Sequence, residues 1–173
     1  MPQNKKERFL FGLIMSYTMA IGMEVYNIAI KMGFHTNPGG LATMTNAVFP
    51  AALAEAAYMG LIVLLTSSLW GNRLGAAIAN RCLSPDDVPP FIFSLVRQSA
   101  TVLIMCPTMS LIAAILFGIF LGGANPIDLP AMWVGTIIKN FPMALLWNIF
   151  AAAPVTRLIF GLFVKNAPSS DPS

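Results

Sequence analysis

The sequence predicts an all-α integral membrane protein with four transmembrane helices, arranged as two parallel helix-hairpin repeats. Of its 173 residues, 57% are hydrophobic and only 10% are charged, whereas about 25% are charged in an ordinary soluble domain. The mean hydropathy is +0.73, and the apolar residues gather in runs close to the roughly 20 positions that cross about 30 Å of hydrocarbon. Similar segments in the two halves predict the repeats. This composition excludes soluble enzyme folds.

Four apolar runs are expected to form the spans, at residues 9–30, 49–70, 101–123 and within 131–164. The first run exceeds the roughly 7–15 apolar residues of a cleavable signal peptide, so it is expected to stay as an anchor. Proline lacks a backbone donor and ends or kinks the helix that precedes it. A short interfacial helix or a kinked segment is therefore expected before Pro50 and before Pro142, and a bend is expected at Pro107.

The positive charges predict the orientation of the chain. With four crossings both termini share one side, and among the Lys and Arg residues only Lys31 and Lys139 lie on the other side. Segments rich in Lys and Arg stay in the cytoplasm. Both termini, with the tail after the last span, and the connection at 71–98 are thus expected in the cytoplasm, and the protein in a bacterial inner membrane. The cations form no basic stripe, so nucleic acid is not an expected partner.

Two pairs of segments predict an internal repeat. Residues 13–20 and 103–110 share five of eight residues, and the Phe-Pro segment at 49–53 resembles the one at 141–145 in nearly the same register. Each unit holds two crossings, so both copies enter the membrane in the same direction, as parallel repeats do. The expected units are residues 1–98, with the cytoplasmic N-terminus and the connecting loop, and residues 99–173, with the cytoplasmic tail.

Several of these residues also carry a resemblance to a known family. They are the leader Asn4-Lys5-Lys6-Glu7, Met23 with Tyr26-Asn27 at the end of the first span, and the two Phe-Pro units. The chain resembles the bacterial membrane family called domain of unknown function twenty-seven ninety-eight. The resemblance implies a tandem pair of two-helix units over nearly the whole chain. It implies no activity and no site residues, and in the second unit Ala114, Leu116 and Phe117 replace Glu24, Tyr26 and Asn27.

Glu24 and Glu55 are the most informative side chains, because an ionisable residue inside a span costs several kcal/mol. Each lies six residues from the outer end of its span, roughly 9 Å deep, so the two carboxylates are candidates for a shared proton or cation site. Tyr17, Asn27 and Lys31 fall on the same stripe as Glu24. An alternative is that Lys31 neutralises Glu24 while Glu55 lies in the interfacial zone.

Small residues recur every fourth position on the first two spans, which lets helices approach closely. Gly12, Ser16 and Ala20 lead directly to Glu24, so Glu24 is expected on the packing face and not toward lipid. Met15, Met19 and Met23 share the same period; a thioether stripe can bind copper(I), but packing is the favoured interpretation. Lys139 and Asn140 form either an outer vestibule or the polar cap of a kinked helix.

The favoured function is a small transporter or exporter that exchanges a proton or cation for a small, cationic solute. The alternative is a non-transporting accessory or envelope-stress protein whose acids only fix helix packing. An enzyme is not expected, because the chain has one His and two Cys and no nucleophile beside a base; no metal and no cofactor are expected either. The expected partners are the lipid bilayer and further copies of the chain, because four short spans enclose little volume.

Overall fold

Four long helices make up almost all of the computed structural model, which describes residues 4–84 and 88–165, the last two without their side chains. The first is α1 (Lys5–Lys31). The second joins α2 (Val48–Thr66) to α3 (Asn72–Cys82) through a π-helical segment, Ser67–Gly71. The third is α4 (Pro90–Ala113) with a π-helical end, Ala114–Phe120. The fourth joins α5 (Leu129–Trp147) to α6 (Ala153–Lys165) through a π-helical segment, Asn148–Ala152.

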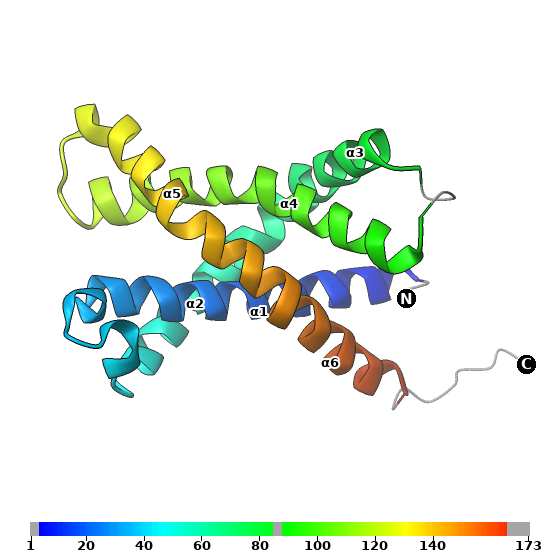
Figure 1. The fold of residues 1–173 in the computed structure, drawn as a ribbon, viewed down its shortest axis with the longest axis horizontal. Coiled ribbons are helices and arrows are strands. Elements are labelled where there is room, and N and C mark those ends of the chain that lie inside the picture. The colour runs from blue at the N-terminus through cyan, green and yellow to red at the C-terminus, as the bar shows by residue number, and fades with distance from the viewer. Residues whose placement is uncertain (1–3, 85–87, 166–173) are drawn as a thin grey trace, which may run out of the picture.

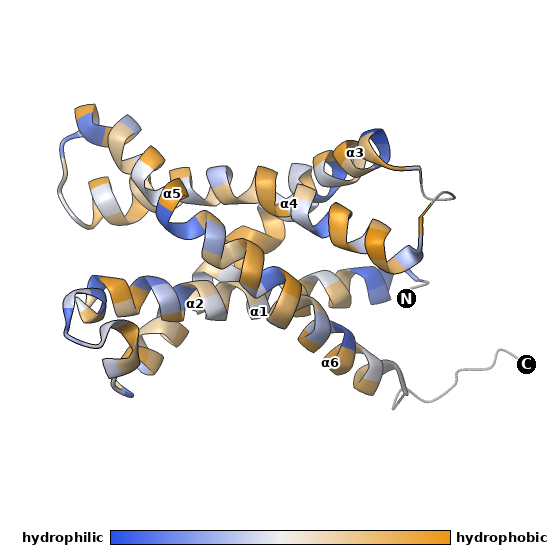
Figure 2. Cartoon of the chain, in the orientation of Figure 1, coloured by the Kyte–Doolittle hydropathy of each residue, from blue (hydrophilic) through white to orange (hydrophobic). Residues whose placement is uncertain are grey.

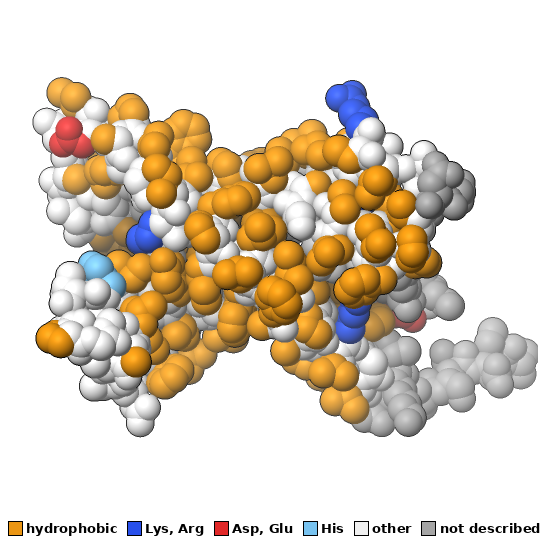
Figure 3. Space-filling model, in the orientation of Figure 1, with side chains coloured by type: hydrophobic (Ala, Val, Ile, Leu, Met, Phe, Trp, Pro, Cys, Tyr) orange, Lys and Arg blue, Asp and Glu red, His pale blue; other side chains and the backbone are white. Residues whose placement is uncertain are grey.

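Each of these helices is long and apolar enough to cross a membrane, and the described residues include no strand. The predicted all-α membrane protein with four spans is therefore confirmed. Apolar residues run along all four helices in Figure 2, and hydrophobic side chains cover most of the face in Figure 3. Large side chains such as Phe9, Phe120 and Phe150 are exposed. This outward apolar surface is what a bilayer requires and what water disfavours.

The helix ends differ from the predicted ones. The connection expected at 71–98 is mostly helical, because α3 extends the second span to Cys82 and α4 begins at Pro90, eleven residues before the expected start. The fourth span begins at Pro126, not at 131. The hydropathy pattern ends these spans early because Arg73, Arg81 and Arg97 are polar, although arginine is a good helix former. The predicted cytoplasmic tail after residue 165 lies outside the described residues.

The two halves of the chain cross each other in an X (Figure 1). α1 packs against α2 and α6, and α4 packs against α3 and α5. The helix α2–α3 therefore begins beside α1 and ends beside α4, while α5–α6 begins beside α4 and ends beside α1. The start of α1, the end of α6 and the α3–α4 connection lie at one end of the bundle, and the segments after α1 and after the third span lie at the other.

The prolines behave differently in the two halves. Before Pro50 the chain forms two short 3₁₀ helices, Phe34–Thr36 and Gly40–Thr43, so the expected short helical segment is present there. Before Pro142 no break occurs, and the expected interfacial helix is wrong, because α5 runs without interruption from Leu129 through Pro142. Pro107 likewise lies inside α4. Prolines are tolerated within membrane helices, and α4 continues through Pro107, whose carbonyl accepts a hydrogen bond from Trp133 Nε1 at 2.9 Å.

Stripes of small residues face the interior of the bundle, as predicted for α1 and α2. Ser16, Ala20 and Glu24 are 3–4% exposed, and Ala52 and Ala56 at most 2%. Similar stripes line α4 and the fourth helix, where every fourth residue is buried: Val102, Cys106, Ser110 and Ala114 on the former, and Asn140, Ala144, Asn148, Ala152 and Thr156 on the latter. The expectation that Glu24 faces the packing side is confirmed.

Candidate functional site

A cavity of about 1720 Å³ runs through the centre of the bundle, lined by residues of all four long helices. Arg8 and Lys31, near opposite ends of α1, both line it, so it follows roughly 35 Å of that helix at ~1.5 Å per residue. Typical small-molecule pockets occupy about 300–1,000 Å³. A single chain thus encloses enough volume for a small solute, and the volume argument for a homo-oligomer does not hold. The oligomeric state itself stays a prediction.

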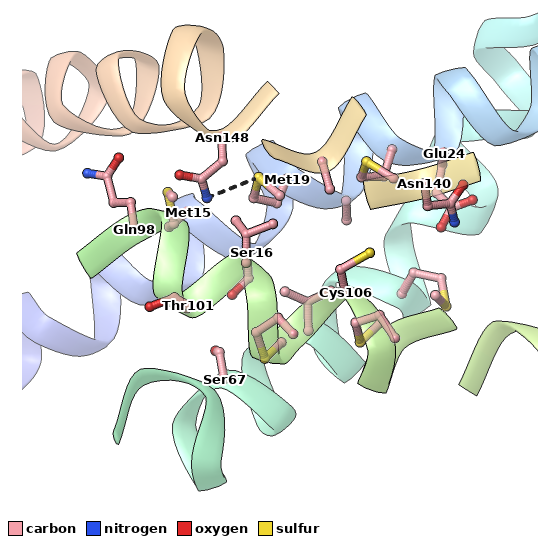
Figure 4. A pocket seen from close by; sticks show the side chains of 18 of the residues that line it. Met15, Ser16, Met19, Glu24, Ser67, Gln98, Thr101, Cys106, Asn140 and Asn148 are labelled. Carbon is pink, nitrogen blue, oxygen red and sulfur yellow. Dashed lines mark hydrogen bonds between the residues drawn. The ribbon is translucent and has the colours of Figure 1, made fainter. Parts of the chain in front are cut away.

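Charged and amide side chains gather where α1 and α5 meet, at what we call the acidic end of the cavity. Its members are Glu24, Asn27, Lys31, Glu55, Lys139 and Asn140, all of which line the cavity. The two helices are tied together here by Tyr26, whose hydroxyl donates to the Lys139 carbonyl at 3.2 Å. Figure 4 shows the Glu24 and Asn140 side chains together at this end. Asn140 therefore lines the cavity from within an uninterrupted helix and caps no helix end, and its role in an outer vestibule stays a prediction.

Glu24 and Glu55 have different surroundings. The Lys31 ammonium lies 3.4 Å from Glu55 Oε1, with side chains that are 64% and 20% exposed. Glu24 is only 4% exposed, and within the described part of the chain it has neither a hydrogen bond nor an ion pair. Lys31 thus forms its ion pair with Glu55. The alternative interpretation required Lys31 to pair with Glu24. Both carboxylates line one cavity; that they share a proton or a cation stays a prediction.

Of the other predicted site residues, Asn27 and Lys31 line the cavity and Tyr17 does not. The Tyr17 hydroxyl donates to the Ala57 carbonyl at 3.2 Å. Its ring occupies the space beside Gly60, where an added Cβ would lie 2.8 Å from Tyr17 ring carbons. Tyr17 therefore packs α1 against α2, and the structure does not bring it together with the acidic end.

Within the described part of the chain, three asparagine oxygens are buried without a hydrogen-bond partner: Asn27 Oδ1, Asn140 Oδ1 and Asn148 Oδ1. Such orphaned acceptors are rare and call for an explanation. The Asn148 amide donates to the sulfur of Met19 at 3.6 Å, which leaves its oxygen free (Figure 4). The sequence interpretation missed Asn148. The available signal was the four-residue spacing of Asn140, Ala144 and Asn148, the same period that identified the packing face of α1.

Methionines line the middle of the cavity: Met15, Met19, Met23, Met59, Met105, Met109 and Met132. Three of their sulfurs accept hydrogen bonds from neighbouring helices, Met19 from Asn148, Met15 from Thr156 at 3.4 Å and Met109 from Thr66 at 3.6 Å. These contacts fit the predicted packing role. No group of three or more His, Cys, Asp and Glu side chains that could hold a metal occurs among the described residues.

Comparison with known proteins finds a family match in the first half of the chain. Residues 4–80 match the family described as Domain of unknown function (DUF2798). The chain is also 27% identical over 165 residues to the uncharacterized protein YybC of Bacillus subtilis (strain 168), with 95% of this chain and 96% of that protein covered. No solved structure gives a significant match. The resemblance to this family is confirmed, and a second, tandem unit after residue 98 stays a prediction.

The DUF2798 match contains only part of the acidic end. Glu24, Asn27, Lys31 and Glu55 fall inside it, whereas Lys139 and Asn140 lie beyond it. The acidic end is therefore completed by the second half of the chain, which supplies the buried amide of Asn140.

Arginines line the opposite end of the cavity, which we call the arginine end. Arg8, Arg97 and Arg157 come from three different helices, and the Arg157 guanidinium donates to Ser94 Oγ at 2.8 Å. Among the described lining residues the acids are Glu24 and Glu55, both at the other end. The cavity therefore connects the arginine end, with three positive side chains, to the acidic end, with side chains of both charges.

Proposed function

We propose that this protein is a small multi-pass transporter or exporter of a bacterial inner membrane, which couples the movement of a small solute to a proton or another cation. The carrying observation is Glu24, a buried carboxyl that lines a cavity of about 1720 Å³ and has no described partner. A charge inside a membrane span costs several kcal/mol and is usually functional. A group held in this way interacts with whatever cation enters the cavity.

The proposed orientation places the arginine end in the cytoplasm. Arg8, Arg97 and Arg157 lie there, as do the start of α1 and the α3–α4 connection, and positive residues favour the cytoplasmic side. The acidic end then faces outward. The carboxylates of the acidic end support a cationic solute. A cation bound there would supply the partner that Glu24 lacks among the described residues.

The test is proton movement in liposomes that contain the purified protein and a trapped pH-sensitive dye. Small cations such as tetramethylammonium and guanidinium are added outside, and the dye response is recorded. We expect at least one of them to move protons with the wild-type protein and not with Glu24→Gln, because the amide keeps the shape and cannot exchange a proton or neutralise a cation. A Glu24→Gln protein with wild-type proton movement would contradict the proposal.

Glu55→Gln is the matched variant, since it removes the other carboxylate of the acidic end. A shared Glu24–Glu55 site predicts that both variants lose coupling. A site formed by Glu24 alone predicts that Glu55→Gln retains it, because Glu55 already has Lys31 as its partner. Thermal unfolding of both variants in detergent separates loss of coupling from loss of fold.

The second candidate is a non-transporting accessory or envelope-stress protein, and the Lys31–Glu55 pair favours it, because that pair joins α1 to α2. In that case Glu24→Gln is neutral or stabilising, since burial of an amide costs less than burial of a charge, and none of the added cations moves protons. We also propose a homo-oligomer. A monomeric mass in native mass spectrometry from mild detergent would contradict it.

A further inference from the structure

The unpartnered oxygens at the acidic end lie on two helices that are held together at that level. Glu24 and Asn27 are three residues apart on α1, so they lie on one face of it. Asn140 is next to Lys139, whose carbonyl is tied to Tyr26. Asn140 is 6% exposed and Glu24 4%, and the Asn27 and Asn140 amide oxygens have no partner. Three oxygen-bearing groups without a described partner therefore line the same end of the cavity.

A proton alone leaves this arrangement incomplete. A protonated carboxyl has one O–H to donate, so it can satisfy one of the two amide oxygens, and the other stays a buried acceptor without a donor. An unmade hydrogen bond of that kind costs about 1–3 kcal/mol. A cation, in contrast, contacts several oxygens at once, and carboxylate and amide oxygens are the ligands that hard cations prefer.

The charges at the acidic end indicate the charge of the cation that fits there. Lys31 and Glu55 form a pair that is neutral overall, and Lys139 is exposed on α5. Of the two carboxylates at this end, Glu24 has no ion pair among the described residues, and Lys139, which lines the same cavity, forms none with it. The two lysines and two glutamates together are neutral, so a singly charged ion adds the least excess charge. A divalent ion such as Ca²⁺ takes about 6–8 oxygen ligands, among them several carboxylates, and this end offers fewer.

We infer that Glu24, Asn27 and Asn140 form a binding site for a small monovalent inorganic cation such as Na⁺. The inference rests on the proposed function, in which this ion would exchange with the proton at Glu24. It assigns a ligand role to Asn140, which the sequence interpretation left as a vestibule or capping residue, and to Asn27, which that interpretation grouped with Glu24 in a proton or cation site. Asn148 is excluded from the site, because it lies eight residues beyond Asn140, roughly 12 Å along the helix.

Na⁺-dependent thermal stability of the purified protein tests the site without any transport. The protein is unfolded in detergent with increasing NaCl, with choline chloride making up a constant ionic strength. A ligand that binds only the folded protein raises its stability with concentration. We expect Na⁺ to raise the midpoint temperature of the wild-type protein above its value in choline. The absence of such an increase would overturn the inference.

Two variants locate the site, and a third variant serves as their matched control. Glu24→Gln and Asn140→Leu should each weaken the Na⁺ response at least about tenfold, and Leu has the same branched heavy-atom skeleton as Asn, although it is larger, without the amide oxygen. The control is Asn148→Leu, which removes the same kind of orphaned amide from the same helix face and should keep the wild-type response. Equal loss in Asn148→Leu, or full retention in Asn140→Leu, would overturn the assignment.

The design also handles variants that fold poorly. Removal of an orphaned buried amide is expected to leave the protein without Na⁺ as stable as the wild type or more stable, so the informative quantity is the increase caused by Na⁺ within each variant. The result is separable from the proposed function. Na⁺ binding without proton or solute movement would keep the site and contradict transport, whereas proton movement without Na⁺ binding would do the reverse.

Discussion

The packing stripes of α1 and α4 occupy matching positions in the two halves of the chain, ninety residues apart. Ser16 and Ala20 correspond to Cys106 and Ser110, and all four side chains are small and at most 6% exposed. One turn further on, Glu24 corresponds to Ala114, and both are 4% exposed. The two helices thus bury the same kind of face, and only one carries a charge on it.

The second helices of the two halves also differ by one polar residue, but here the second half carries it. Val48 begins the stripe of α2 and is fully buried, whereas the corresponding Asn140 of α5 brings an amide to nearly the same depth of burial. The Glu24 carboxyl of the acidic end therefore comes from the first half and the Asn140 amide from the second. Glu24 and Asn140 line the same cavity because α5 packs against α1. The comparison teaches that small residues set how the helices pack, and that single polar replacements set where the site lies.

The largest effect is expected from placing a charge on the second half. Ala114→Glu should destabilise the protein by about 2.5–3.5 kcal/mol, the cost of a carboxylate at the centre of a membrane helix, because Ala114 is only 4% exposed and the new carboxylate would be buried. Ala114→Gln, which adds the same volume without the charge, is the control. Unfolding in detergent micelles measures both, and equal stabilities of the two variants would contradict the comparison.

A smaller loss is expected at Gly22 of α1, against which the ring of Trp147 packs. An added Cβ at Gly22 would clash with the Trp147 ring, whose Nε1 donates to the Thr18 carbonyl at 3.0 Å; the matching residue of the second half is Ile112. Gly22→Ala should cost about 1–3 kcal/mol through overpacking.

Gly135→Ala on α5 is the control for that substitution. A Cβ at Gly135 meets nothing within 4 Å, so this change should stabilise the helix by about 0.5–1 kcal/mol, the usual advantage of Ala over Gly. If both glycine variants shift the unfolding midpoint equally, the close contact between α1 and Trp147 is not what holds the two halves together.

The smallest effect concerns the pair that joins α1 to α2. Lys31 and Glu55 are 64% and 20% exposed, and partly exposed ion pairs contribute about 0–1 kcal/mol. Glu55→Gln should therefore change the free energy of unfolding by less than Ala114→Glu does. A loss as large as that of Ala114→Glu would show that the pair is a main structural tie at the acidic end.

The sequence predicted the four spans and the inward face of α1, since long apolar runs and the four-residue spacing of small side chains are local properties of the chain. It did not predict the helical extent of 71–82, because arginines end an apolar run without ending a helix. Nor could it place Asn140 against Glu24, since no periodicity tells which helices touch. The Lys31–Glu55 pair was missed for the same reason: the choice between two nearby acids depends on distances between α1 and α2.

The second and fourth long helices have 35 and 38 residues, roughly 52 and 57 Å at ~1.5 Å per residue, against about 30 Å of hydrocarbon. Helices of this length fit a bilayer by tilting or by projecting from it, and the tilt follows membrane thickness. Because these two helices cross on opposite sides of α1 and α4 (Figure 1), a change in their tilt changes the angle of the X. Lipid chain length thereby becomes a variable that acts on the width of the cavity.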